Sequence, residues 1–144
     1  MKYKLLTDET KVHEGVTLYR IQALKDFSNV KAGDKGGWIE KESNLLQSGN
    51  AWIYGNARVY GSAWVFGHAK VYDNAWIYEK AMVYGNAMVY GNAEVNGDSK
   101  IYDNAKIYDN AKIYDNAKVY GNAEVYGNSE VYGNLEVSRN TEIY

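Results

Sequence analysis

Two histidines, His13 and His68, are the side chains in this sequence best suited to acid–base catalysis near neutral pH. His13 lies in the segment Lys-Val-His-Glu-Gly, which is typical of a turn, and His68 stands where most copies of a short repeat carry Asn. The sequence contains no Cys, which excludes disulfide bonds, thiolate catalysis and zinc-thiolate sites. We therefore interpret His68 first as a substitution at an exposed turn.

Aspartates at the turns of the repeat are the other residues that could bind a ligand, because calcium prefers carboxylate oxygens. They are Asp73, Asp103, Asp109 and Asp115. Three of them fall at consecutive turns and therefore point in different directions. We expect solvated turn residues with Asx-type hydrogen bonds, and predict no metal site and no cofactor.

A six-residue repeat is the element that positions these residues. From Ile53 to Ile143 an Ile or Val recurs at every sixth residue, in the frame Ala-x-Val-Tyr-Gly-Asn. The alternation predicts a short strand with Ala and the aliphatic residue facing inward, and the Gly-Asn pair predicts a turn. Six residues cannot bury their own apolar side chains, so the repeats must stack as a solenoid. A stack of β-hairpins is the alternative, but it gives no reason for six-residue identity.

The repeat resembles that of the hexapeptide-repeat family over roughly the last two thirds of the chain, since Ala or Ser precedes the aliphatic residue by two positions and Asn follows it by three. This resemblance implies an all-β fold, a single-stranded left-handed parallel β-helix with three hexads per coil and just over five coils. The left hand rests on the resemblance alone, because general crossover rules favour the right hand. The segments Tyr19–Leu24, Gly36–Glu40 and Gly49–Ala51 are also similar to YdcK-like repeat proteins of bacteria, phages and prophages.

The chain is expected to divide into an N-terminal cap, residues 1–48, and the β-helix, residues 49–144. Within the cap, Thr17–Leu24 alternates like a strand, Lys2–Leu6 is a candidate hairpin partner, and Lys31–Trp38 is typical of a tight glycine-rich loop. Such a cap would protect the first edge of the solenoid from strand addition by another chain.

The phase of the aliphatic residues changes between cap and repeat. Ile39 and Leu45 are six residues apart but two residues out of phase with Ile53. This predicts an irregular first coil with an insertion near Gln47-Ser48.

Tyrosine is unusually frequent, with 15 copies against 2 of Phe. With three hexads per coil, the outward aromatic residues fall into columns. One column holds Tyr54, Tyr72, Tyr90, Tyr108, Tyr126 and Tyr144, a second Phe66, Tyr84, Tyr102 and Tyr120, and a third Tyr60, Tyr78, Tyr114 and Tyr132, interrupted at Asn96. The x position of the frame Ala-x-Val-Tyr-Gly-Asn also faces outward. There we expect opposite charges to pair across coils, at Lys106–Glu124, Lys112–Glu94, Lys112–Glu130 and Lys118–Glu136.

These tyrosine ladders are the best functional indication in the sequence. Stacked rings could serve only to stabilise a parallel sheet. They could also form a binding surface for a protein or a carbohydrate, because Tyr, Trp and Met are enriched in the cores of protein interfaces. The candidate binding residues are Tyr54, Tyr72, Tyr90, Tyr108, Tyr84, Tyr102, Trp52, Trp64 and Trp76. We predict a non-catalytic scaffold or macromolecule-binding protein, for which the family resemblance implies a homotrimer.

An acyltransferase is the alternative that the resemblance implies, because many hexapeptide-repeat proteins transfer an acyl group from acyl-CoA at clefts between the subunits of a trimer. His68 is then the candidate catalytic residue. No coil carries the inserted loop that would wall such a cleft, and the zinc site of a γ-type carbonic anhydrase would need three His where this chain has 2.

Charge and hydropathy limit the remaining partners. The formal net charge of -2 provides no general attraction to nucleic acid or to an anionic membrane. The N-terminus lacks the apolar core of a signal peptide, and no run of residues reaches membrane-spanning length. We expect a cytoplasmic protein that binds neither nucleic acid nor membrane.

Overall fold

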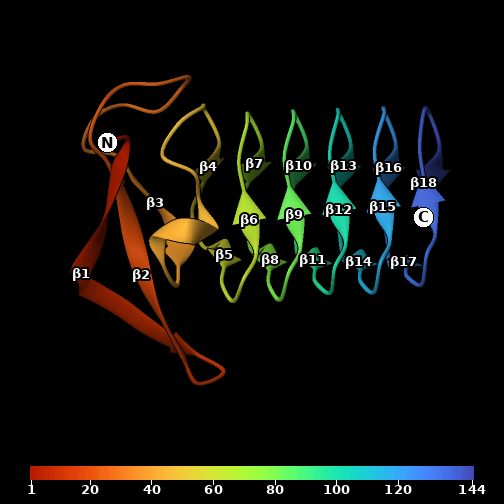
Figure 1. Cartoon of the computed structure of the whole chain (residues 1–144), viewed down its shortest axis with the longest axis horizontal. Helices are drawn as coiled ribbons and strands as arrows, with labels where there is room; N and C mark the ends of the chain where they lie inside the picture. Colours follow the sequence, from red (N-terminus) through yellow and green to blue (C-terminus); the bar gives the residue numbers. More distant parts are fainter.

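The computed structural model describes all 144 residues as a parallel β-solenoid with a β-hairpin across its N-terminal end (Figure 1). The C-terminus lies at the opposite end of the solenoid axis. Besides the strands there is one short 3-10 helix, η1 (Glu42–Asn44). No helix has the length and apolar character needed to cross a membrane.

The strands form three sheets. The eight-stranded sheet contains, in order of pairing, β1 (Tyr3–His13), β2 (Val16–Ala23), β3 (Lys35–Ile39), β5 (Arg58–Val59), β8 (Trp76–Ile77), β11 (Glu94–Val95), β14 (Lys112–Ile113) and β17 (Glu130–Val131). The six-stranded sheet contains β19 (Glu142–Ile143), β16 (Glu124–Val125), β13 (Lys106–Ile107), β10 (Met88–Val89), β7 (Lys70–Val71) and β4 (Trp52–Ile53). The five-stranded sheet contains β18 (Glu136–Val137), β15 (Lys118–Val119), β12 (Lys100–Ile101), β9 (Met82–Val83) and β6 (Trp64–Val65).

Parallel pairing joins each repeat strand to the strand one coil further along the chain. Met88 pairs with Lys106 and Val89 with Ile107, so partners are separated by three six-residue units. Backbone hydrogen bonds continue beyond the short strands, as where the amide of Tyr90 donates to the carbonyl oxygen of Ile107 at 2.9 Å. The prediction of an all-β parallel solenoid is confirmed, and the left hand of the coil stays a prediction.

Alanine and the aliphatic residue of each hexad fill the interior. A single cluster of 34 buried residues runs along the axis, and Ile77, Val95 and Ile113 stack in it with no exposed surface. Each aliphatic side chain contributes roughly 1.5–3 kcal/mol by burial. Alanine is required beside them because little space remains within the coil, and a larger side chain would overpack it.

The corners contain a hydrogen bond that the sequence did not reveal. Asp73 and Asp109 have φ of 58°, and the carboxylate of Asp73 accepts a hydrogen bond from the amide of Gly91 at 3.1 Å, one coil further on. The carboxylates of Asp103, Asp109 and Asp115 accept from Gly121, Gly127 and Gly133 in the same way. The expectation of local Asx-type bonds is therefore wrong at these corners, because their backbone conformation directs the side chain along the axis toward the next coil.

The cap is a hairpin that continues into the eight-stranded sheet. β1 pairs antiparallel with β2, β2 pairs antiparallel with β3, and β3 pairs parallel with β5. The glycine-rich segment expected as a loop over Lys31–Trp38 is partly wrong, since β3 begins at Lys35. Gly36 and Gly37 are needed in this strand, because an added Cβ would lie 2.5 Å from the carbonyl oxygen of Ile53 and 2.6 Å from that of Ala57, respectively.

The first coil has a different register from the later ones. Ile39 pairs with Val59, and Leu45 bridges Val65, so each partner lies two residues further on than in the regular coils. This offset accommodates the change of phase seen in the sequence. The division at residue 48 stays a prediction.

Buried contacts hold the cap on the first coils. The hydroxyl of Tyr3 donates to the carbonyl oxygen of Glu42 at 3.0 Å, and the ring of Tyr3 meets that of Trp52 with centroids 6.1 Å apart. Phe27 packs on the same indole at 5.3 Å. Trp52 is consequently only 1% exposed.

Candidate binding surfaces

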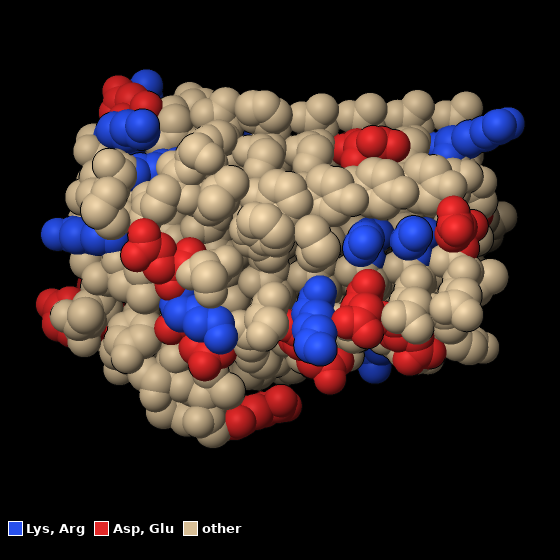
Figure 2. Space-filling view, in the orientation of Figure 1, with Lys and Arg blue, Asp and Glu red and all other residues tan.

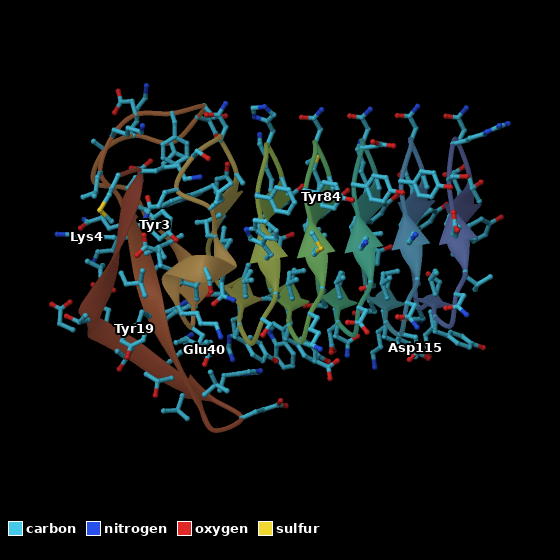
Figure 3. The ribbon with its side chains drawn as sticks, viewed as in Figure 1. Tyr3, Lys4, Tyr19, Glu40, Tyr84 and Asp115 are labelled. Atoms are coloured by element: carbon cyan, nitrogen blue, oxygen red, sulfur yellow. The ribbon has the colours of Figure 1, made fainter.

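Stacked aromatic rings form the longest regular feature of the surface. The rings of Tyr72 and Tyr90 are nearly parallel, with centroids 4.7 Å apart, and those of Tyr90 and Tyr108 follow at 4.9 Å. The column that contains Tyr84 stacks in the same way along the axis (Figure 3). Because each ring lies against the next, mainly ring edges and hydroxyl groups remain for a ligand.

Many of the tyrosine hydroxyls bond to a glutamate in the next coil. Tyr108 donates to Glu124 at 2.8 Å, and Tyr78 donates to Glu94 at 3.1 Å. The other members of this set are Tyr114–Glu130, Tyr120–Glu136 and Tyr126–Glu142. Burial and the carboxylate of Glu94 raise the pKa of Tyr78 to about 12. These hydroxyls are therefore occupied within the chain.

The predicted lysine–glutamate pairs have the expected register, but they do not form ion pairs. Lys106 and Glu124 are direct partners in β13 and β16, yet the ion pairs of the structure are Lys31–Asp26 and Lys35–Glu9, both within the cap. The glutamates take a tyrosine hydroxyl instead. Charged side chains of both signs are interspersed along the molecule (Figure 2).

A groove follows the first column at Tyr54 and Tyr72. It has a volume of about 750 Å³ and is lined by Asn29, Tyr54, Gly55, Asn56, Lys70, Tyr72, Asp73, Asn74, Met88, Gly91 and Asn92. The hydroxyl of Tyr54 donates to Asn29 at 3.0 Å, whereas those of Tyr72 and Tyr90, like those of Tyr84 and Tyr102 in the second column, make no hydrogen bond in the chain. The next outward residues are Met88 and Lys106, which cannot accept a hydrogen bond as glutamate does.

The candidate tryptophans occupy three different environments. Trp52 lies under the cap, Trp64 is 38% exposed beside Phe66, and Trp76 is partly buried. The structure thus brings Tyr54 and Tyr72 together in one groove but leaves Trp64 on another sheet.

His68 lies exposed at a corner and lines a hollow of about 360 Å³ with Ser28, Asn50, Lys70, Asn86 and Met88. Its imidazole makes no hydrogen bond within the chain. No second group therefore orients it, as an activated catalytic base would require.

The buried histidine is His13, which sequence reasoning assigned to a simple turn. Its Nε2 lies 3.1 Å from the hydroxyl of Tyr60, and its ring meets that of Trp76 at 4.4 Å. The guanidinium of Arg58 contacts Nδ1. A guanidinium can only donate, so Nδ1 is unprotonated and Nε2–H donates to Tyr60. Burial, followed by the charge of Arg58, lowers the pKa of His13.

The repeat pattern could not predict the cluster of His13, Arg58, Tyr60 and Trp76, because the pattern does not determine where the tip of the hairpin lies. The one available signal is Arg58 itself, an arginine in an outward position that holds Trp, Met, Lys or Glu in the other repeats.

Comparison with known proteins supports the assignment of the repeat. Residues 51–67 and 81–97 match the model of the YdcK β-solenoid repeat. These two segments are therefore similar to the YdcK repeat. A protein of Escherichia coli (strain K12), named Uncharacterized acetyltransferase YdcK, is 51% identical over 41 residues. That stretch is 28% of this chain and 13% of the relative, so the chain matches a small part of YdcK.

The matched YdcK-type repeats contain part of the groove. The first matched segment includes Tyr54 and Asn56, and the second includes Met88, Gly91 and Asn92. His68 directly follows the first matched segment and lies outside it.

Proposed function

We propose that this chain is a rigid, non-catalytic β-solenoid scaffold that binds another protein through a surface composed of Tyr54, Tyr72, Tyr90, Lys70 and Met88. The observation that carries the proposal is the groove lined by Tyr54, Lys70, Tyr72 and Met88. Beside it the hydroxyls of Tyr72 and Tyr90 have no partner within the chain, while five others bond to glutamates. Hydroxyls without an internal partner are available for donation to a ligand.

A protein fits this surface better than a sugar that stacks on aromatic faces. The rings of Tyr72 and Tyr90 cover one another at 4.7 Å, so a sugar ring cannot lie flat between them. Their edges, the adaptable side chain of Met88 and the asparagine amides at the neighbouring corner suit the mixed apolar and hydrogen-bonding contacts of a protein interface.

The test compares protein capture by three forms of the chain. A double variant, Tyr72→Ser with Tyr90→Ser, removes the proposed surface, and Tyr102→Ser with Tyr120→Ser removes equivalent rings from the second column as a control. Cross-linked partners from the source cells should be retained by the original chain and the control and lost by the first variant. Retention of the same partners by all three forms would contradict the proposal.

The homotrimer implied by the hexapeptide-repeat resemblance is part of this proposal. Light scattering of the original chain should give the mass of three subunits. If the groove surface mediates self-association, the Tyr72→Ser, Tyr90→Ser variant should scatter as a smaller species.

An acyltransferase is the second candidate, supported by the printed name of the Escherichia coli relative and by the hollow beside His68. In this alternative His68 acts as the base and acetyl-CoA is the donor. Calorimetry should then detect acetyl-CoA binding, and His68→Ala should abolish transfer to an acceptor amine or hydroxyl. Absence of acetyl-CoA binding by the assembled protein would reject this candidate.

A further inference from the structure

A second pocket lies on the other side of the corner asparagines, beneath the tip of the hairpin. It has a volume of about 460 Å³ and is lined by Lys11, Asn56, Arg58, Asn74, Trp76, Asn92 and Glu94. Trp76 is its one apolar residue. Polar groups thus dominate this pocket, which shares Asn56, Asn74 and Asn92 with the groove but has its own cations, Lys11 and Arg58.

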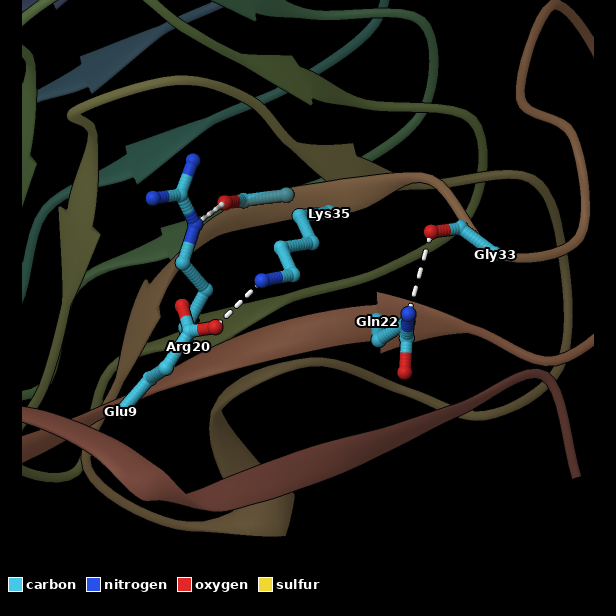
Figure 4. A network of polar contacts seen from close by, with 6 residues as sticks. Glu9, Arg20, Gln22, Gly33 and Lys35 are labelled. Atoms are coloured by element: carbon cyan, nitrogen blue, oxygen red, sulfur yellow. Dashed lines mark hydrogen bonds and ion pairs between the residues drawn. The ribbon is translucent and has the colours of Figure 1, made fainter.

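Two cations enter the pocket without an acidic partner. Neither Lys11 nor Arg58 has a carboxylate oxygen within 4.0 Å, whereas Lys35 elsewhere in the cap pairs with Glu9 (Figure 4). The hydrogen bond that Arg58 makes within the chain goes to the imidazole of His13, and its Nε is buried without any partner. Most donors of this guanidinium therefore lack an acceptor.

Arg20 adds to the positive charge around Lys11. The ammonium group of Lys11 lies 4.3 Å from the centroid of the Trp38 ring, and Arg20 approaches the same ring at 5.5 Å. Arg20 donates to the carbonyl oxygen of Gly36, which is not charged (Figure 4). Burial and then the charges of Arg58 and Arg20 lower the pKa of Lys11. These cations are thus held close together without a carboxylate within ion-pair distance.

Acidic groups near the pocket limit the charge of its ligand. Glu94 lines the pocket and accepts a hydrogen bond from Tyr78, and Glu14 acts on His13 from the hairpin turn. The two positive charges of Lys11 and Arg58 and the one negative charge of Glu94 leave the pocket with a single net positive charge. A carboxylate matches this charge and also the planar fork of the guanidinium.

The remaining lining residues indicate what carries the carboxylate. Asn56, Asn74 and Asn92 recur at intervals of one coil, about 4.8 Å, and offer amide donors and acceptors. Amide groups can donate hydrogen bonds to the hydroxyl groups of a sugar ring and accept bonds from them, and Trp76 forms an apolar wall of the pocket. We propose that this pocket binds a hexuronic acid, with the sugar carboxylate on Lys11 and Arg58 and the hydroxyls on the asparagines.

The experiment titrates the full chain with D-glucuronate and with neutral D-glucose, by calorimetry and by observing the His13 imidazole in NMR spectra. Glucuronate should bind and shift the His13 resonances, and glucose should bind far more weakly. Arg58→Gln should weaken glucuronate binding roughly ten- to one-hundredfold, the effect of losing a charged hydrogen-bond partner. Lys118→Gln, on the five-stranded sheet, is the matched control and should bind normally.

Arg58→Gln also removes the contact between Arg58 and His13. A second variant that keeps this contact separates loss of binding from misfolding of the hairpin. Lys11→Gln removes the lysine charge and its contact with the Trp38 ring, and should also weaken glucuronate binding, with only a small fall of the thermal unfolding midpoint. Equal binding of glucuronate by the original chain, Lys11→Gln and Arg58→Gln would overturn the site. Equal binding of acetate and glucuronate would overturn the assignment to a sugar.

Discussion

The hydroxyl of Tyr108 donates a hydrogen bond to Oε1 of Glu124, 2.8 Å away in the next coil. Phenylalanine could form the same ring stack, but it could not make this bond. The contact recurs wherever glutamate occupies the corresponding outward position, from Tyr78–Glu94 to Tyr126–Glu142. It gives a physical reason for the excess of Tyr over Phe in these columns.

Removal of the Tyr108 hydroxyl should therefore destabilise the solenoid. Tyr108→Phe is expected to reduce the free energy of unfolding by about 0.5–1.5 kcal/mol, the usual net contribution of one hydrogen bond. Tyr72→Phe is the matched control in the same column and should leave stability nearly unchanged, because its hydroxyl has no partner in the chain. Urea unfolding measures both, and equal losses in the two variants would contradict this explanation.

The contact between Tyr114 and Glu130 should appear in alkaline titration. The hydrogen bond to Glu130, followed by burial, raises the pKa of Tyr114 to about 12. A raised pKa favours the neutral phenol in the folded state, so this stabilisation is present below about pH 10 and is lost as pH rises toward 12. Glu130→Gln should lower the pKa of Tyr114. An NMR titration in which the Tyr114 ring signals are resolved from those of the other tyrosines measures this pKa. An unchanged pKa in that variant would show that Glu130 is not the cause.

Glycines at one corner allow a test of how closely the coils approach. An added Cβ at Gly97 would lie 2.7 Å from the backbone nitrogen of Asp115, while at Gly133 nothing lies within 4 Å. Both residues have nearly the same φ, 65° and 64°. Gly133→Ala should cost about 1–2 kcal/mol from the left-handed conformation alone, and Gly97→Ala should cost clearly more. Thermal unfolding of the two variants checks this order, and equal midpoints would argue against the close approach.

Acid should weaken the attachment of the hairpin through His13. Arg58, Lys11, Glu14 and Glu94 surround this imidazole, and burial is the main cause of its lowered pKa. With a folded pKa below the unfolded value of about 6.5, the stabilisation is complete above that pH and declines as pH falls below it. Unfolding midpoints measured from pH 7 to about 5 should fall, and His13→Gln should reduce this dependence. A slope that is identical in His13→Gln would assign the effect to other groups.

The periodic part of the fold could be predicted because the repeat fixes every neighbour. Once three hexads form a coil, Ile107 must stack on Val89, and Tyr90 must follow Tyr72. Backbone pairing therefore follows from counting residues. The choice of partner by Glu124 does not, because Lys106 and Tyr108 both approach it and side-chain geometry decides between them.

The non-periodic cap explains the rest of what the sequence could not show. Nothing in the alternation of β1 places His13 beside Arg58, since that contact depends on how the hairpin lies across the coils. The same holds for Trp52, whose outward position in the repeat made it a candidate binding residue although it lies in the coil next to the cap. Tyr3 and Phe27 from the cap cover it instead.

Replacement of Trp52 and Trp64 distinguishes these two environments. Both occupy the same position in the hexad, but Trp52 is 1% exposed and Trp64 is 38% exposed. Trp52→Ala should reduce the free energy of unfolding by about 3–5 kcal/mol and loosen the cap, because a large buried side chain is lost. Trp64→Ala should cost much less, since the indole already contacts water. Chemical unfolding combined with amide hydrogen exchange in β1 and β2 measures both effects, and equal losses would mean that the cap does not cover Trp52 in solution.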